Sequence, residues 1–142
     1  WAPTTLTWGV DNRTTALRVL TGGAKSARLE TRVCGSDTNP YLAMAACLAS
    51  GLFGIKNNLK LQPSTKGNGY EEFQYGKLPK NLNEAASAMK KSAVAQELFG
   101  KEFISHFVQT REWEWREYKK AVKGNQDKKV TNWELKRYFE II

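Results

Sequence analysis

Three charged residues alternate with uncharged ones in the segment ARLETRV (residues 27–33), namely Arg28, Glu30 and Arg32. Side chains two positions apart in a β-strand share a face and stand about 6.7 Å apart, so all three would line one face. A carboxylate flanked by two guanidinium groups stays ionised at neutral pH, because opposite charges favour the charged form. Such a carboxylate can bind a divalent metal ion, and the arginines can hold anions beside it. The alternative is a solvated sheet edge whose charges oppose aggregation.

Further cations precede this segment on what should be neighbouring strands. Arg13 and Arg18 fall in the turn and strand before it, and Lys25 follows the turn formed by Gly22 and Gly23. Five cations and one carboxylate would therefore converge, which suits a phosphate chain, a metal ion and a carboxylate substrate. The sequence has no Walker-type glycine-rich loop, so we expect recognition by side chains on a sheet.

The first third of the chain should supply these strands. The segments TTLTWGV, TTALRVL and SARLETRV alternate and are rich in β-branched residues, with DNR and TGGAK as the turns between them. Three short strands joined in this way predict an antiparallel meander at the start of the chain. The alternation also places Leu29 and Val33 on the face opposite the charges, toward the core.

The rest of the chain predicts helices. Asn39 can cap a helix that Pro40 opens, and this helix should run to about Leu59, apolar nearly all round and therefore buried, with Cys47 inside it. A long polar loop rich in glycine and proline follows. Further helices are expected over residues 82–91, 92–99 and 101–123 and, after the polar segment KGNQDKK, behind a capping box of Thr131 and Glu134. Strands followed by packed helices indicate the α+β class.

The composition narrows the class of protein. With 142 residues, 41% of them hydrophobic, the chain has the size of one globular domain. Its longest uncharged apolar run, Tyr41 to Ile55, is shorter than the roughly 20 residues that cross a bilayer. Two cysteines without a CxxC spacing indicate no structural disulfide and favour a cytoplasmic location. The net charge of +8 fits a nucleic-acid-binding module, but the tryptophans follow helical or strand spacing and form no evident stacking platform.

Several of these motifs resemble a known family. The stretches WGVDNRTTALRV, ARLETRV and NPYLAMAACLASGLFGIKN, followed by LP-NLNEA and ELFG-EF, are similar to the C-terminal part of the catalytic domain of glutamine synthetase. The similarity extends over nearly the whole chain and is densest from Thr7 to Asn57. The ordered set Asn-Arg, Arg, Arg-x-Glu-x-Arg and Asn-Pro-Tyr-Leu-Ala carries most of it.

The resemblance implies a glutamate–ammonia ligase. In that family ATP phosphorylates the γ-carboxylate of glutamate, ammonia then displaces the phosphate, and Mg or Mn neutralises the phosphates. By position, Glu30 matches a metal ligand and Arg32 matches the arginine that holds glutamate. Arg13 matches a catalytic arginine near the reacting phosphate and the glutamate. The cations that match the family's ATP-binding set are Arg13, Arg18, Lys25 and Arg28.

The resemblance also sets limits. One metal-binding carboxylate cannot form several metal sites, and the family's other ligands and its N-terminal β-grasp domain would lie upstream of Trp1. We therefore interpret residues 1–142 as the C-terminal part of a glutamine synthetase-like catalytic domain, inactive by itself, whose parent enzyme would be a ring-shaped homo-oligomer. The acceptor could also be a larger amine, as in related enzymes. His106, outside every matched motif, is assigned to packing or the surface.

Overall fold

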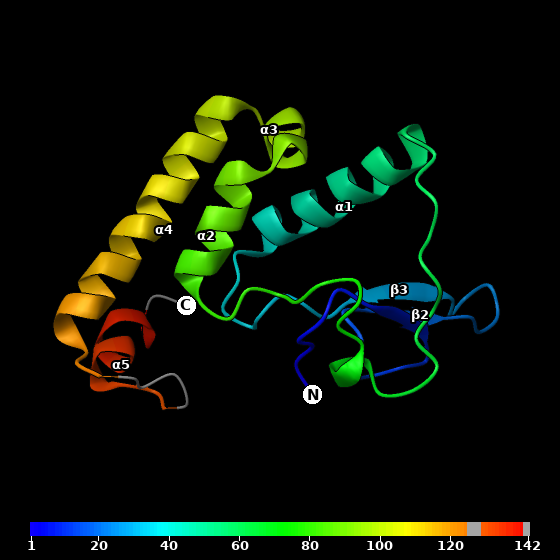
Figure 1. Ribbon diagram of the computed structural model, residues 1–142, viewed down its shortest axis with the longest axis horizontal. Helices are drawn as coiled ribbons and strands as arrows, with labels where there is room; N and C mark the ends of the chain where they lie inside the picture. Colours follow the sequence, from blue (N-terminus) through cyan, green and yellow to red (C-terminus); the bar gives the residue numbers. More distant parts are fainter. Residues whose placement is uncertain (125–128, 141–142) are drawn as a thin grey trace. The chain divides into compact units, whose positions relative to one another are not determined.

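The computed structural model describes residues 1–124 and 129–140. Short strands come first and helices follow, which confirms the predicted α+β class (Figure 1). The chain divides into two compact units, Trp1–Leu78 and Pro79–Ile142. None of the helices in the described ranges is both long enough and apolar enough to span a bilayer.

The first unit contains a three-stranded sheet of β1 (Trp8–Val10), β2 (Leu17–Leu20) and β3 (Arg28–Thr31), in that order across the sheet. Strands β2 and β3 are antiparallel, as the sequence predicts. Strands β1 and β2 are parallel, so the predicted antiparallel meander is wrong at its first pair. Alternation assigns each residue to a face of the sheet, but the chain direction depends on how the strands are connected.

The connection between β1 and β2, residues 11–16, is a compact loop that returns the chain to the start of β1. Asp11 takes a left-handed conformation with a φ of 49°. The hydroxyl oxygen of the buried Thr15 lies 2.9 Å from the carbonyl oxygens of both Asn12 and Leu17. These local contacts allow β2 to begin beside the start of β1 and to run in the same direction.

Helix α1 covers Pro40–Lys56, close to the predicted range. Asn39 caps it as predicted, and its side chain accepts a hydrogen bond from the Leu42 amide at 3.1 Å. The predicted burial is wrong: none of the helix residues is buried, Leu48 is 66% exposed, and Cys47 is exposed as well.

The exposure of α1 has a simple physical reason. An apolar helix is buried only where other elements surround it. In this unit α1 contacts the small sheet, where the Cys47 thiol donates to the Thr31 hydroxyl at 3.5 Å. One short sheet cannot cover a helix of 17 residues. Leu29 and Val33, which were predicted to face the core, are likewise exposed.

Residues 57–81 contain the predicted long loop, with the short 3₁₀ helix η1 (Gly69–Glu71) inside it. The loop is attached to the first strands rather than free of them. The Thr65 amide donates to the Trp8 carbonyl at 2.8 Å, and the Thr5 hydroxyl donates to the first carbonyl of η1 at 2.6 Å. The interior of this unit is therefore held largely by hydrogen-bonded threonine hydroxyls and not by a large apolar core. The buried polar residues of this unit are Thr5, Thr7, Thr15 and Thr65.

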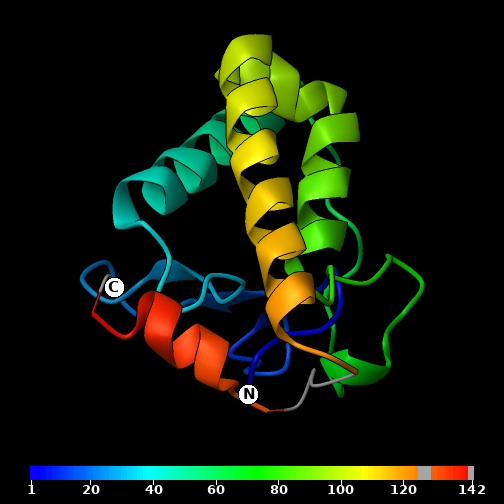
Figure 2. The same ribbon diagram turned by 90° about the vertical axis from the view of Figure 1, so that its left-hand side faces the viewer.

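The second unit is helical. Its elements are α2 (Leu82–Lys91), α3 (Ala93–Phe99), α4 (Lys101–Ala121) and α5 (Asn132–Tyr138). Figures 1 and 2 both show α2 and α4 side by side, and their shared core consists of Ala86, Ile104 and Val108. The apolar stripe that predicted α4 therefore does pack against another helix.

The predicted helix boundaries in this unit are largely confirmed. Asn81 caps α2, and Thr131 with Glu134 forms the capping box of α5. Helix α4 ends two residues before the predicted Lys123, at Ala121. The polar segment predicted between α4 and α5 includes residues 125–128, which lie outside the described residues.

Glu114 is a buried carboxylate that joins α4 to α5. Arg137 donates to it from Nε at 2.9 Å and from Nη2 at 3.2 Å, and the Tyr138 hydroxyl also donates to it. Burial alone would raise the pKa of Glu114, but the hydrogen bonds from Arg137 and Tyr138 outweigh burial and hold the pKa below its usual value. The ionised form is therefore the one that the fold stabilises.

We expect Glu114→Gln to lower the free energy of unfolding by about 1 to 2 kcal/mol at pH 7, because a charged hydrogen-bond acceptor is lost and its partner Arg137 is partly solvated. Because the folded-state pKa is lowered, this contribution is complete above the usual glutamate pKa of about 4.3 and disappears as the pH falls through the folded-state value. Urea denaturation at pH 7 and pH 3 should show the difference between the two proteins shrinking in acid.

Glu112→Gln is the matched control for this experiment. Glu112 also lies on α4, and its partner is the exposed Lys90, at 3.0 Å. Exposed ion pairs contribute little, so the control should change stability by less than about 0.5 kcal/mol. Equal losses in both variants at pH 7 would contradict a special role for Glu114.

Candidate functional site

The charged face of the sheet is built around Arg18 and Glu30. The register places these residues directly opposite each other on β2 and β3, and Arg18 Nη1 lies 3.1 Å from Glu30 Oε2. Arg18 also forms an ion pair with Asp11, the first residue after β1. Its side chain is only 12% exposed. The guanidinium of Arg18 is therefore fixed between two carboxylates.

Glu30 is in turn held between two guanidinium groups. Arg28 donates to Glu30 Oε1 from Nη2 at 2.9 Å and from Nε at 3.1 Å, while Arg18 holds the other oxygen. Burial would raise the pKa of Glu30, but the hydrogen bonds and charges of Arg18 and Arg28 hold it below its usual value. The expected carboxylate between two guanidinium groups is present, with Arg18 in the place where Arg32 was expected.

Arg32 instead reaches the turn that follows β1. Its guanidinium donates to the carbonyl oxygen of Arg13 and, at 3.0 Å, to that of Trp1. Arg32 thus joins the end of β3 to this turn through main-chain atoms. The Arg13 side chain is exposed, and no hydrogen bond or ion pair within the described residues engages its guanidinium.

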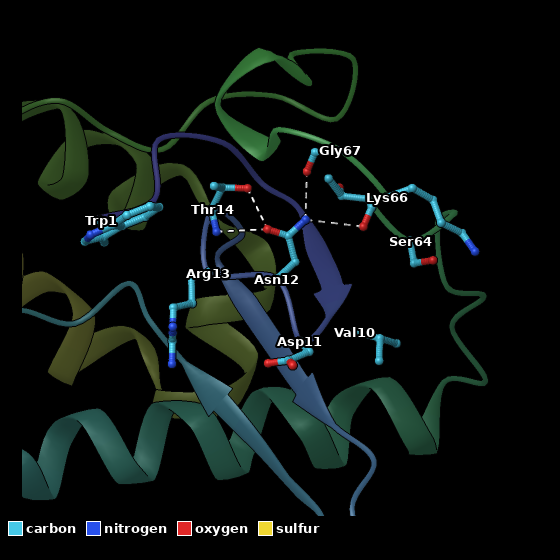
Figure 3. Close-up of a pocket in the computed structure, with 10 residues that line it drawn as sticks. Trp1, Val10, Asp11, Asn12, Arg13, Thr14, Ser64, Lys66 and Gly67 are labelled. Atoms are coloured by element: carbon cyan, nitrogen blue, oxygen red, sulfur yellow. Dashed lines mark hydrogen bonds between the residues drawn. The ribbon is translucent and has the colours of Figure 1, made fainter.

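A pocket of about 790 Å³ lies beside this turn. Figure 3 shows the turn on one side of it, the loop segment 64–67 on another and the Trp1 ring at one end. In this view the Asn12 amide points toward the loop, whereas the Arg13 side chain points the opposite way. The lining residues are Trp1, Val10, Asp11, Asn12, Arg13, Thr14, Ser64, Thr65, Lys66 and Gly67.

The structure brings most of the predicted site residues together, but not all. Arg18, Arg28 and Glu30 form one ion-paired group, and Arg13 and Arg32 are joined through the main chain. Lys25 lies exposed in the turn between β2 and β3. Within the described ranges it forms no hydrogen bond or ion pair with the other members of the site.

Sequence reasoning missed Asp11 and Asn12, which belong to the DNR turn and were treated only as a connection. The Asp11 carboxylate pairs with Arg18, and it holds its charge because hydrogen bonding and attraction by Arg18 lower its pKa. Asn12 bonds to the distant loop carbonyls of Thr65 and Gly67. No local spacing signals contacts of that kind. The Arg13 cation and the Asn-Arg pair of the family resemblance pointed to this turn, but not to the contacts of Asp11 and Asn12.

Glu30 is suited to bind a divalent cation, but only as one ligand of several. Oε2 of the ionised carboxylate accepts one hydrogen bond, from Arg18, and keeps a second lone pair, whereas Oε1 accepts two from Arg28. Carboxylate oxygen suits Mg²⁺ or Mn²⁺. Within residues 1–124 and 129–140, no three or more His, Cys, Asp or Glu side chains lie together so that they could hold a metal ion. His106, which was assigned to packing or the surface, is exposed on α4 in the second unit. A metal bound by Glu30 would need further ligands from another source.

The arrangement of charges defines what chemistry the site can support. Guanidinium groups bind phosphate and carboxylate oxygens, and cations fixed in advance stabilise negative charge on a transferring phosphoryl group. Arg18 and Arg28 are fixed by carboxylates, and Arg13, whose positive charge also acts on Asp11, has an exposed side chain. The site is therefore suited to bind anionic substrates and to stabilise negative charge on a phosphoryl group during its transfer.

Comparison with known proteins identifies one family. The family model described as "Glutamine synthetase, catalytic domain" matches residues 1–138. The whole chain is 48% identical to type-1 glutamine synthetase 2 of Dictyostelium discoideum, of which it covers 26%. It is 40% identical, again over its whole length, to a glutamate–isopropylamine ligase of a Pseudomonas species, of which it covers 30%. A glutamine synthetase of Thermotoga maritima is 35% identical over 97% of the chain, which covers 31% of that protein. The chain thus spans only a quarter to a third of the length of these relatives.

Proposed function

Because this chain belongs to the glutamine synthetase catalytic-domain family, we propose that it is the C-terminal part of the catalytic domain of an ATP-dependent ligase. In this proposal the full-length enzyme joins ammonia to the γ-carboxylate of glutamate. The observation that carries the proposal is the ion-paired group of Arg18, Glu30 and Arg28 on the sheet, together with the exposed Arg13 on the turn after β1, whose guanidinium has no hydrogen bond or ion pair within the described residues.

The reaction requires two steps that a cationic site can assist. The γ-phosphoryl group moves from ATP to the glutamate γ-carboxylate, and ammonia then attacks the acyl phosphate, releasing phosphate and leaving the amide. We assign Arg13 to the negative charge on the transferred phosphoryl group and on glutamate, since its guanidinium is exposed and unengaged within the described residues. Arg32 is assigned to glutamate.

The remaining cations are assigned to ATP. Arg28 is 54% exposed and can contact a phosphate directly, and Lys25 is exposed in the neighbouring turn. Arg18 is 12% exposed and engaged by two carboxylates, so its contact with ATP would be limited to a small surface. Its larger contribution is to hold Glu30 in place. Glu30 would supply one ligand to Mg²⁺ or Mn²⁺, which neutralises phosphate charge when bound.

The relatives leave two kinds of acceptor to compare. Glutamine synthetases are named among them, and so are a glutamate–isopropylamine ligase and a γ-glutamylethanolamide synthetase. An assay of the full-length protein with glutamate, ATP and Mg²⁺ or Mn²⁺ should therefore compare ammonia, isopropylamine and ethanolamine. Phosphate release that depends on ammonia and yields glutamine supports the proposal. Amide formation only with a larger amine would change the acceptor, and no amide with any amine would refute the proposal.

Arg28→Lys and Arg32→Lys should separate nucleotide binding from glutamate binding. Lysine keeps the charge but loses the planar fork that holds two oxygens. We expect Arg28→Lys to raise the KM for ATP, and Arg32→Lys the KM for glutamate, each roughly ten- to a hundredfold. Steady-state kinetics with each substrate varied in turn would measure both effects. KM values close to those of the wild type in both variants would instead support the alternative that residues 27–33 form a solvated sheet edge.

Three further predictions belong to the same proposal. The isolated chain should show no ligase activity, because Glu30 alone cannot complete a metal site. The parent enzyme should be a ring-shaped homo-oligomer. Its location should be cytoplasmic.

A further inference from the structure

The side chain of Asn12 joins the turn after β1 to the loop segment 64–67. Its Oδ1 accepts two hydrogen bonds from Thr14, one from the amide at 2.9 Å and one from the hydroxyl at 2.7 Å. Its Nδ2 donates to the Gly67 carbonyl at 2.8 Å and lies 3.5 Å from the Thr65 carbonyl oxygen. Figure 3 shows the amide between Thr14 and the loop. Because Asn12 accepts on one side and donates on the other, neither aspartate nor leucine could reproduce these bonds.

Thr14 extends this connection to η1. Its hydroxyl donates to Asn12 and also accepts a hydrogen bond from the Gly69 amide at 2.7 Å. The hydroxyl is therefore used as donor and acceptor at once. The turn after β1 is thus bound to the loop at several points by two neighbouring side chains, which we call the Asn12–Thr14 clamp.

The two segments also approach each other too closely for larger residues. A Cβ atom on Gly9 would lie 2.9 Å from Asn12 Cβ and 2.9 Å from the Thr65 carbonyl oxygen. A Cβ atom on Gly69 would lie 2.7 Å from the Thr14 carbonyl oxygen. Such contacts require one segment to shift. Packing and hydrogen bonding together therefore fix the turn against the loop.

Arg13 lies between the two residues of the clamp. Its own carbonyl oxygen accepts a hydrogen bond from Arg32. Its main chain is thus held on both sides and at its carbonyl, while its guanidinium remains exposed. The structure has fixed the base of this side chain and left its charged end available.

We propose that Asn12 is a positioning residue that places the Arg13 guanidinium for the reaction by tying the turn after β1 to the loop. This inference rests on the proposed function, in which Arg13 meets the transferred phosphoryl group. In the proposed role, Asn12 itself contacts no substrate. A displacement of about 1 Å in a group that acts on the reacting atoms can reduce the rate a hundredfold.

The first test is Asn12→Ala in the full-length enzyme, which removes the clamp without adding charge. We expect kcat to fall about 10- to 100-fold, while the KM values for ATP and glutamate change less than about threefold. Asn57→Ala is the matched control, since the Asn57 amide also donates to a carbonyl, that of Phe53, at 2.9 Å, but at the far end of α1. The control should leave kcat unchanged.

The second test combines the clamp with Arg13. If Asn12 acts through Arg13, the double variant Asn12→Ala/Arg13→Gln should be no slower than Arg13→Gln alone. A merely structural role would make the two losses multiply, because independent effects add in free energy. If Asn12→Ala does not fold, Thr14→Val supplies the same comparison, because it removes the hydroxyl from the clamp and keeps Asn12.

The outcomes separate this inference from the function on which it rests. A wild-type enzyme that forms no amide from glutamate overturns the proposed function and the inference with it. An active wild-type enzyme with an unchanged kcat in Asn12→Ala, or with multiplying losses in the double variant, overturns the positioning role alone. A reduced kcat with non-multiplying losses supports both.

Discussion

Glu30→Gln should lower the turnover of the full-length enzyme by about 100- to 1,000-fold, the largest effect we expect from any change on the sheet. Glutamine has nearly the same shape, so β3 should be preserved. It presents an amide NH₂ group to either Arg18 or Arg28, which are both donors, and it removes the charge that would bind Mg²⁺ or Mn²⁺. Kinetics with the metal concentration varied should also show weaker metal activation.

Asp11→Asn is the matched control for Glu30→Gln. Asp11 is the other carboxylate on Arg18, but its side chain is 72% exposed, and it contacts Nε and Nη2 of the guanidinium whereas Glu30 contacts Nη1. If Glu30 only balanced the charge of Arg18, the two changes would have similar effects. We expect Asp11→Asn to reduce turnover less than about tenfold. Equal losses would remove the proposed metal role from Glu30.

Arg13→Gln should reduce kcat by about 100- to 1,000-fold without loss of stability. The guanidinium is exposed and makes no hydrogen bond or ion pair within the described part of the chain. Because its removal breaks no such contact, the free energy of unfolding should not change. The positive charge is lost only where the phosphoryl group would be transferred. Single-turnover measurement of phosphate release, with thermal denaturation alongside, would separate the two properties.

Arg116→Gln controls for a general effect of charge. Arg116 is exposed on α4 in the second unit, and its replacement removes the same single charge from the protein. We expect its activity to remain within about twofold of the wild type, because exposed charges outside the ion-paired group are screened by salt. A loss as large as that of Arg13→Gln would show that net charge, and not position, sets the rate.

The sequence by itself determined the features that depend on neighbouring residues. The caps at Asn39, Asn81 and Thr131 start helices where predicted, because a cap bonds to an amide two or three residues away. The alternation of Arg28 and Glu30 placed both on one face of a strand, where they form an ion pair. The motif order identified the family.

The tertiary structure decided whatever depends on segments distant in the chain. It made β1 parallel to β2, replaced Arg32 by Arg18 beside Glu30, and left α1 exposed where burial had been predicted. Apolarity shows that a helix can be buried, but what covers it is a property of other segments.

The Asn12–Thr14 clamp shows, within a single turn, the same difference between what neighbouring residues determine and what the tertiary structure decides. The sequence placed Asn12 and Arg13 side by side but could not show which of them points toward the loop. That depends on Thr65 and Gly67, more than 50 residues further along the chain. Hydrogen bonds between residues so far apart in the chain form only when folding brings their segments together, which closes a long loop. Local residue patterns therefore cannot predict them.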